Sequence, residues 1–376
     1  MTMTGVERLL VVSPNWLGDA VMALPAIGDL HRHFPHARLI VAARRAIAGL
    51  FMMSPIVDEV IAMEWSGRVW ARRSRRADIA ALRALRVDAS VLLPNSFASA
   101  WLVHRAGIPE RWGYETDMRQ RLLSRSIRRP TIRVHQAEYY RRLVKGLGVE
   151  NGPLDPDLVV PRRAIEQARE MLRAAGWDEH RPLVVMAPGA AYGGAKRWPA
   201  EHFAEIATRL VCEHGAHCVL VGSAADASTT RWVRALVAAD AQRGIVDVAG
   251  STTLDTLTGV LGLARACVSN DSGAMHLAGA VGVPLAALFG PTRERETAPL
   301  SRPHRRLEVL INHVWCRPCM LRECPLDHQC MKGLSPERVL ATVTDLIGTR
   351  DSGFGTREPR TLNPPDPGSR IPNPEL

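Results

Sequence analysis

Apolar runs of strand length alternate with stretches of helical periodicity along most of the chain. In the first half, strands are predicted at Leu9–Ser13, at Leu39–Ala43, around Val60 and at Val91–Leu93. An apolar helical pattern follows the first strand as far as Phe34, and helices are predicted to dominate residues 98–147. Strands that alternate with helices in this way predict a mainly parallel sheet with helices on both faces.

The alternation stops at Val149–Pro161 and then restarts. That segment holds one glycine and three prolines, which predicts a linker or an extended crossover. Later strands are predicted at Leu183–Met186, Cys218–Val221, Val246–Val248, Ala266–Ser269 and Leu285–Phe289. The fold class is therefore α/β, with two doubly wound domains at residues 1–160 and 161–350 and ligands at the carboxyl ends of the strands. The Pro- and Gly-rich tail, residues 351–376, is predicted to be disordered.

Size and hydropathy narrow the class of protein. At 376 residues the chain is long enough for two domains that each bury a core. No run of about 18 or more apolar residues predicts a membrane-spanning helix, and the first apolar run is too short for a signal peptide. The expected location is the cytoplasm.

The net charge of +10 is concentrated in one segment. Residues 68–142 hold 17 arginines and 6 acidic residues. Such a surplus favours a polyanionic partner, which could be nucleic acid, an acidic glycan or an anionic membrane face. A solvated arginine-rich surface is an equal alternative.

Three predicted strand ends in the second half carry glycines next to polar side chains. The first is VVMAPGAAYGGAKRWP, where Gly189 and Ala190 begin a loop that ends at Lys196. Glycines let backbone amides approach a phosphate closely, and a lysine adds a mobile positive charge. Because Lys196 is one of only three lysines against 45 arginines, an ammonium group here indicates phosphate binding rather than an incidental surface loop.

The second strand end is VLVGSAADAST, with Gly222 at the strand terminus and Asp226 four residues later. In doubly wound folds an acidic residue at this place often receives ribose hydroxyls. A helix-capping aspartate is an equally ordinary explanation.

The third strand end is VSNDSGAMHLAGAVGVP. Asp271 or Ser272 can cap the helix that follows, and the exposed N–H groups and the dipole of its first turn favour an anion. Gly273 keeps bulk away from that end. His276 shares a face of that helix, either as a ligand or as a buried core histidine. Three such strand ends around one cleft predict a nucleotide that carries a diphosphate.

The first half contributes one similar corner, NWLGDA, where Asp19 follows Gly18 at the end of the first strand. A carboxylate there can act as a general base if it faces the cleft, or it can simply begin the helix. No GxGxxG follows the first strand, and GxxxxGK[ST] is absent from both halves. These absences argue against a dinucleotide oxidoreductase and a P-loop NTPase.

Together these motifs resemble the glycosyltransferases that add heptose to the inner core of lipopolysaccharide. The resemblance covers Leu9 to Ile347 and is carried by NWLGDAVMALPAI, LLPNSFASAW, APGAAYGGAKRWP and VSNDSGAMHLAGAVGVPLAALFGPT. It implies the GT-B fold, in which two Rossmann-like domains face a central cleft and bind the acceptor and the nucleotide-sugar respectively. It also implies inverting transfer of L-glycero-D-manno-heptose from ADP-heptose to the first heptose of the inner core. The related enzymes that use a heptose-free or another acceptor are the near alternative.

The resemblance also implies roles for individual residues. Asp19 matches the catalytic base and Lys196 matches the lysine that steadies the donor diphosphate. The implied donor-binding residues are Gly189, Ala190, Lys196, Gly222, Asp226, Asp271, Ser272, Gly273 and His276. The implied acceptor-binding residues are Asn15, Gly18 and Asn95. The chemistry requires no cofactor, and the acceptor is a lipid-anchored Kdo-heptose core at the cytoplasmic face of the inner membrane, where peripheral association is expected.

A cysteine cluster, CRPCMLRECPLDHQC, falls within residues 316–330. Cys316, Cys319, Cys324 and Cys330 have the spacing C-x2-C-x4-C-x5-C. In a reducing cytoplasm four thiolates at this density suit a structural zinc or iron ion. Four reduced cysteines in a loop are the alternative. A basic, zinc-containing nucleic-acid-binding protein is the competing class of function, but the chain has no basic-aromatic alternation, and nucleic acid is not an expected partner.

Overall fold

The structure is a computed structural model that describes residues 5–64, 72–156, 158–302 and 305–348. The predicted disordered tail, residues 351–376, lies outside the described residues. Among the described helices, none combines the length and the apolar character needed to cross a bilayer.

The first half forms a parallel sheet of six strands in the order β3-β2-β1-β4-β5-β6. The strands are β1 (Arg8–Val12), β2 (Arg38–Arg44), β3 (Glu59–Met63), β4 (Ala89–Leu92), β5 (Glu110–Tyr114) and β6 (Arg125–Ile127). The helices are α1 (Leu17–His33), α2 (Arg45–Met52), α3 (Arg72–Ala84), α4 (Phe97–Arg105) and α5 (Gln136–Gly146). This strand order is the doubly wound Rossmann order, whose direction reverses between β1 and β4.

The second half repeats that order in a second parallel sheet, β12-β11-β10-β7-β8-β9. Its strands are β7 (Leu183–Ala187), β8 (His217–Leu220), β9 (Ile245–Asp247), β10 (Ala266–Asn270), β11 (Leu285–Phe289) and β12 (Leu307–Ile311). Its helices are α6 (Arg162–Ala174), α7 (Ala200–Cys212), α8 (Ala227–Leu236), α9 (Leu254–Leu263), α10 (Gly273–Val281), α11 (Glu294–Thr297), α12 (Gln329–Lys332) and α13 (Pro336–Gly348). Here the direction reverses between β7 and β10, and the predicted α/β class is confirmed.

The prediction that helices dominate residues 98–147 is wrong in its middle part. Two strands, β5 and β6, lie there between α4 and α5. Their sequences, ERWGY and RSI, are short and partly polar, so they lack the apolar run that marks a buried strand. The strand β12 was missed as well, although its sequence LEVLI is mostly apolar; it is only half-buried at the far edge of its sheet.

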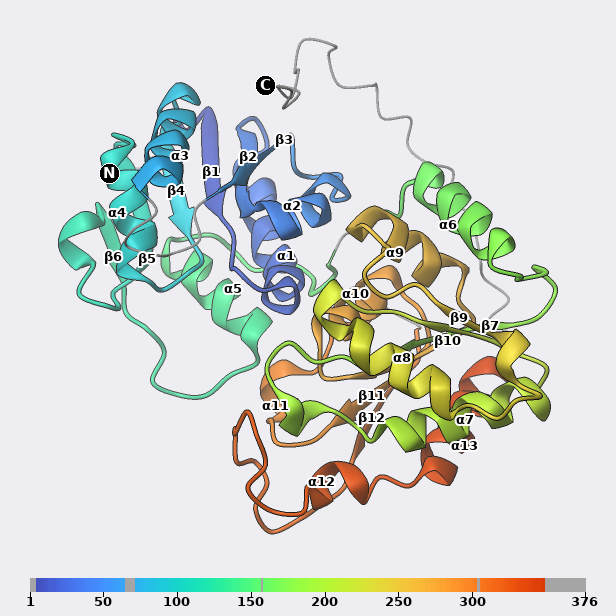
Figure 1. The fold of residues 1–376 in the computed structure, drawn as a ribbon. Helices are drawn as coiled ribbons and strands as arrows, with labels where there is room; N and C mark the ends of the chain where they lie inside the picture. Colours follow the sequence, from blue (N-terminus) through green and yellow to red (C-terminus); the bar gives the residue numbers. More distant parts are fainter. Residues whose placement is uncertain (1–4, 65–71, 157, 303–304, 349–376) are drawn as a thin grey trace.

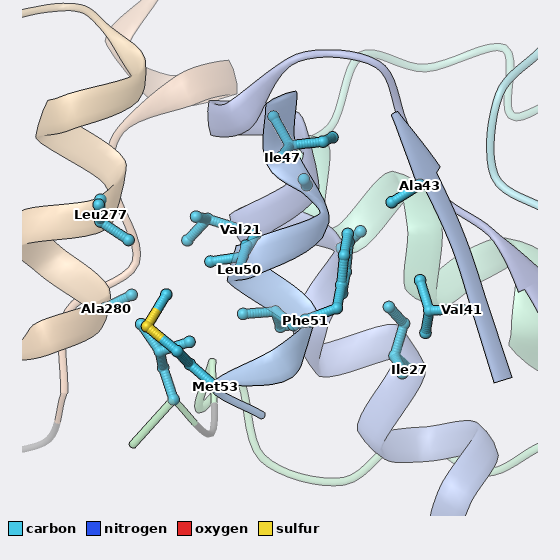
Figure 2. Close-up of a cluster of buried hydrophobic side chains, with 14 of the residues drawn as sticks. Val21, Ile27, Val41, Ala43, Ile47, Leu50, Phe51, Met53, Leu277 and Ala280 are labelled. Atoms are coloured by element: carbon cyan, nitrogen blue, oxygen red, sulfur yellow. The ribbon is translucent and has the colours of Figure 1, made fainter. Parts of the chain in front are cut away.

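A hydrophobic cluster joins the two sheets across α1 and α10, which pack against each other. Figure 2 shows Val21 of α1 and Leu50 of α2 facing Leu277 and Ala280 of α10. In Figure 1, α1 and α10 lie where the blue-to-green half of the molecule meets the yellow-to-red half. Because their N-termini also follow β1 and β10, this contact places the reversal points of the two sheets close together.

Candidate active site

Asp19 lies in the first turn of α1, directly after the end of β1. Burial raises the pKa of its carboxyl, the nearby positive charge of Lys196 lowers it, and the negative charge of Asp271 raises it, with a net increase. Within the described residues this carboxylate has no ion-pair partner. A half-buried carboxylate with a raised pKa and no partner has the properties of a general base.

Lys196 ends a short 3₁₀ turn, Gly194–Lys196, in the loop after β7. Its Nζ lies 2.6 Å from Oδ2 of Asp271, which follows β10, and 4.8 Å from the ring centroid of Tyr192. The hydroxyl of Thr292 donates a second hydrogen bond of 2.6 Å to the same carboxylate oxygen. The lysine is thereby held at the reversal point of the second sheet, the position where doubly wound folds bind ligands.

Asn270 ties the two loops together, a role that the sequence did not reveal. Its side-chain amide donates to the carbonyl of Pro188 at 2.8 Å, and its carbonyl accepts from the backbone N–H of Trp198 at 3.1 Å. Both partners flank the Lys196 loop. The buried asparagine thus fixes the position of that loop relative to Asp271.

The N-terminus of α10 faces the same place. Ser272 occupies the N-cap position, but its side chain makes no capping hydrogen bond. The carboxylate of Asp271 is engaged by Lys196 and Thr292 instead. The prediction that the side chain of Asp271 or Ser272 caps this helix is therefore wrong. Because Ser272 does not cap them, the backbone N–H groups of the first turn suit an anion.

His276 packs against the first turn of α1. It is buried, its Nδ1 has no hydrogen-bond partner in the described structure, and burial lowers its pKa to about 4. The imidazole is therefore neutral near pH 7. A Cβ built on Gly18 would lie 2.6 Å from its Cδ2 atom, and one on Gly273 would lie 3.0 Å from Cβ of Leu17. Glycines at both positions let the two helix N-termini approach each other.

Known proteins place these features in one family. The family model described as glycosyltransferase family 9 (heptosyltransferase) matches residues 75–329. The chain is 32% identical to lipopolysaccharide heptosyltransferase 2 of Escherichia coli strain K12, with 90% of this chain and 98% of that protein covered. The chain belongs to glycosyltransferase family 9, the heptosyltransferases.

Solved structures agree with this membership. The structure of E. coli ADP-heptose lps heptosyltransferase II matches with a TM-score of 0.77 at 31% identity, covering 90% of this chain and 98% of that one. Among the sequence relatives, lipopolysaccharide heptosyltransferase 1 of Pseudomonas aeruginosa is 29% identical, with 90% of this chain and 98% of that protein covered. The two Rossmann-like sheets are accordingly the GT-B fold of the heptosyltransferases, and the protein is a glycosyltransferase.

The close approach of Gly18 to His276 gives a testable expectation for this heptosyltransferase. Gly18→Ala forces α1 and α10 apart, and a displacement of about 1 Å between catalytic groups can lower kcat about 10²-fold. Gly28→Ala in the same helix is the matched control, because its Cβ would come no closer than 3.4 Å to the flexible end of Arg32 and 3.8 Å to Cδ1 of Ile56, which are contacts without a clash. Steady-state kinetics measure both. Unchanged turnover in Gly18→Ala would show that the tight contact is not required.

Asp226 serves as a cap in this heptosyltransferase. Its Oδ2 accepts hydrogen bonds from the backbone N–H and the hydroxyl of Ser223, at 3.0 and 2.7 Å. Its side chain is wedged between two glycines, since a Cβ on Gly189 would lie 2.3 Å from its Cγ and one on Gly222 would lie 2.8 Å from its Cβ. The capping alternative is therefore realised, and a ribose contact remains a prediction.

The predicted acceptor residues lie at the carboxyl ends of β1 and β4. Asn15 is exposed. Asn95 donates its side-chain amide to the hydroxyl of Tyr139 at 2.8 Å, while its Oδ1 is buried without a partner in the described structure. An unpaired buried acceptor of this kind is typical of a binding site, but the acceptor role itself stays a prediction.

The cysteine-rich segment braces the Lys196 loop. Gly194 donates its N–H to Glu323 at 2.9 Å, Ala195 donates to the carbonyl of Arg322 at 2.9 Å, and the ring of His328 donates to the carbonyl of Ala195 at 2.7 Å. Tyr192 donates its hydroxyl to the carbonyl of Met320 at 2.7 Å. These contacts connect the segment to the loop that carries Lys196.

The four cysteines line one cavity of about 390 Å³, which Ala195 also lines. Even so, within the described residues no three His, Cys, Asp or Glu side chains are grouped so that they could hold a metal ion. The arrangement does not fit the zinc or iron ion predicted at Cys316, Cys319, Cys324 and Cys330. That prediction is not supported, and no step of the chemistry depends on it.

Proposed function

We propose that the protein is an inverting transferase that moves L-glycero-D-manno-heptose from ADP-heptose to the first heptose of the lipopolysaccharide inner core. The observation that carries the proposal is the juxtaposition of Asp19 with the Lys196–Asp271 pair, in which the lysine lies close enough to lower the pKa of the aspartate. A direct displacement requires a base on one side and, facing it, a positively charged site that binds the leaving anion. The names of the relatives at 32% identity agree with this acceptor.

In the proposed mechanism Asp19 takes the proton from the attacking hydroxyl of the acceptor. The hydroxyl oxygen forms a bond to the anomeric carbon while the bond between that carbon and the phosphate oxygen breaks. The leaving ADP carries away the electron pair, and its growing negative charge is stabilised by Lys196 and by the N–H groups at the start of α10. Attack opposite the leaving group inverts the anomeric centre. Neutral His276 adds no charge and closes the junction between the helices.

The donor site in this proposal follows the loops after β7, β8 and β10. Lys196, Asp271, Ser272 and Gly273 surround the diphosphate, and Gly189, Ala190, Gly222 and Asp226 line the nucleoside end, with His276 beside the sugar. Asn270 and Thr292 join them as positioning residues, because they hold the Lys196 loop and Asp271.

A basic cavity supports an acidic acceptor. It has a volume of about 470 Å³ and lies between the segment before α5 and the segments around α11 and Pro318. Arg133 and His135 line it from the first half, and Arg293, Arg295 and Arg317 line it from the second. Glu294 and Glu296 line it as well, so that four arginines face two carboxylates. Cationic side chains from both domains suit the carboxylates and phosphates of a Kdo-containing core. Asn15, Gly18 and Asn95 complete the proposed acceptor side.

Location and metal content are the finer parts of the proposal. We place the protein in the cytoplasm, associated with the cytoplasmic face of the inner membrane, because its acceptor is anchored there. No cofactor takes part in the proposed chemistry. Since the four cysteines share one cavity, the metal content of the purified protein merits measurement, with the double variant Cys316→Ser and Cys319→Ser as the control.

The experiment that tests the function offers ADP-heptose together with inner-core acceptors that carry no heptose or one heptose. We expect ADP release and product formation only with the acceptor that already carries one heptose. Turnover only with the heptose-free acceptor would make the protein a heptosyltransferase 1, and no turnover with either would refute the proposal.

A further inference from the structure

Large apolar side chains are exposed after four adjacent strands of the first sheet. Trp16 follows β1, Phe97 follows β4, Met118 follows β5 and Ile132 follows β6, with exposed fractions of 62%, 44%, 92% and 61%. These strands are neighbours in the order β1-β4-β5-β6. Since these strands are parallel, the four side chains lie at the carboxyl-terminal end of the sheet. We call this end the acceptor edge, because α1, which carries Asp19, also begins there.

The chain holds Met118 at this edge in a rare conformation. Asp117 and Met118 have positive φ values of 48° and 52°, which non-glycine residues seldom adopt. The turn is fixed by a 2.5 Å hydrogen bond from the backbone N–H of Phe97 to the carboxylate of Asp117. A locally costly turn that presents an almost fully exposed methionine indicates a functional surface.

Side-chain contacts connect the segments of the acceptor edge into one surface. The hydroxyl of Thr116 donates to the carbonyl of Asn95 at 2.8 Å, and Asn95 donates to Tyr139. The guanidinium of Arg129 lies 6.0 Å from the ring centroid of Tyr139. The segments after β4, β5 and β6 are therefore mutually positioned, and Figure 1 shows the long loop from β6 to α5 that completes this side.

Exposed arginines lie near the apolar side chains in the segments after β5 and β6. Arg121, Arg128, Arg129 and Arg133 are all exposed. Arg128 pairs with Glu115 only at 3.7 Å and Arg133 with Glu296 only at 3.5 Å, so these solvent-facing pairs compete weakly with another anion. Exposed tryptophan and aliphatic side chains among arginines are the pattern of a surface that lies in the interface of an anionic bilayer.

We propose that the acceptor edge docks on an anionic lipid bilayer, with Trp16, Phe97, Met118 and Ile132 entering the interface and the four arginines contacting headgroup phosphates. This deepens the proposed function and rests on it, because a lipid-anchored acceptor has to reach Asp19 from the bilayer. Docking by this edge puts the anomeric reaction centre directly above the membrane surface.

Vesicle co-sedimentation tests the docking. Wild-type protein is expected to bind vesicles of phosphatidylcholine with added phosphatidylglycerol and to bind pure phosphatidylcholine more weakly. Met118→Asp and Ile132→Asp should each lower the partition coefficient about tenfold, because each replaces an apolar side chain that enters the lipid interface when the protein docks. Arg128→Gln should lower it about fivefold on the anionic vesicles only. Aspartate also tolerates the left-handed backbone at position 118, and Trp232→Asp on α8, where the tryptophan is 55% exposed, is the matched control.

A second measurement separates this inference from the proposed function. Met118→Asp and Ile132→Asp should transfer heptose normally to an acyl-free core oligosaccharide and slowly to the same core embedded in vesicles. Wild-type protein that transfers heptose but binds no vesicle, or variants that bind like wild type, would overturn the docking and leave the function intact. Vesicle binding without transfer to either acceptor would refute the function and leave the docking intact.

Discussion

Asp19→Asn is expected to lower kcat by about 10²- to 10⁴-fold, the usual contribution of a positioned general base. Asparagine keeps the size of the side chain and the start of α1, but it cannot take the proton from the acceptor hydroxyl. Binding of ADP, measured by calorimetry, should stay near the wild-type value because the donor loops belong to the other sheet. Asp178→Asn, at an exposed position, is the control and should keep full activity.

The same residue sets the acid limb of the pH profile. Asp19 acts as a base only when it is ionised, so kcat/KM falls as the pH falls through its pKa. Because burial raises that pKa above the ordinary value of 3.8, activity is lost at a higher pH than an exposed aspartate would allow. If the midpoint of the wild-type acid limb lies at or below pH 3.8, or if the Asp19→Asn variant has a normal kcat, Asp19 is not the base.

Lys196→Met is the second change with a large expected effect, a loss of about 10²- to 10³-fold in kcat, typical for removal of one group that stabilises a leaving anion. The affinity for ADP should weaken as well, since the ammonium also faces the diphosphate in the ground state. The acid limb should move to higher pH, because the charge that lowers the pKa of Asp19 is gone. Steady-state rates over a pH series and calorimetry with ADP measure all three.

Two controls separate chemistry from folding in this variant. Lys145→Met changes another of the three lysines, exposed on α5, and should behave like wild type. Lys196→Met leaves Asp271 as a buried carboxylate without its ion pair, which lowers stability. The double variant Lys196→Met with Asp271→Asn should recover the Tm while turnover stays low. Recovery of both would mean that the lysine acts only through stability.

The sequence by itself determined the alternation of strands and helices, and with it the α/β class. Strands such as β1, β7 and β11 are apolar at nearly every position, as a strand that is buried on both faces has to be. The edge strand β6, with the sequence RSI, escaped prediction because an edge position requires little apolar surface. The motifs around Asp19, Lys196 and Asp271 were also readable, since glycines and polar side chains at strand ends are local features.

Only the tertiary structure decided how those local features combine. The ion pair of Lys196 with Asp271, the contact of Gly18 with His276 and the bracing of Ala195 by His328 each join segments that are more than 70 residues apart. Asp226 has the same neighbours in sequence whether it caps a helix or faces a ribose, and the four cysteines have the same spacing whether or not they can hold a metal. Local periodicity predicts which side chains are buried. The partner of a buried polar group depends on how the two sheets pack together, and a local sequence pattern carries no information about that packing.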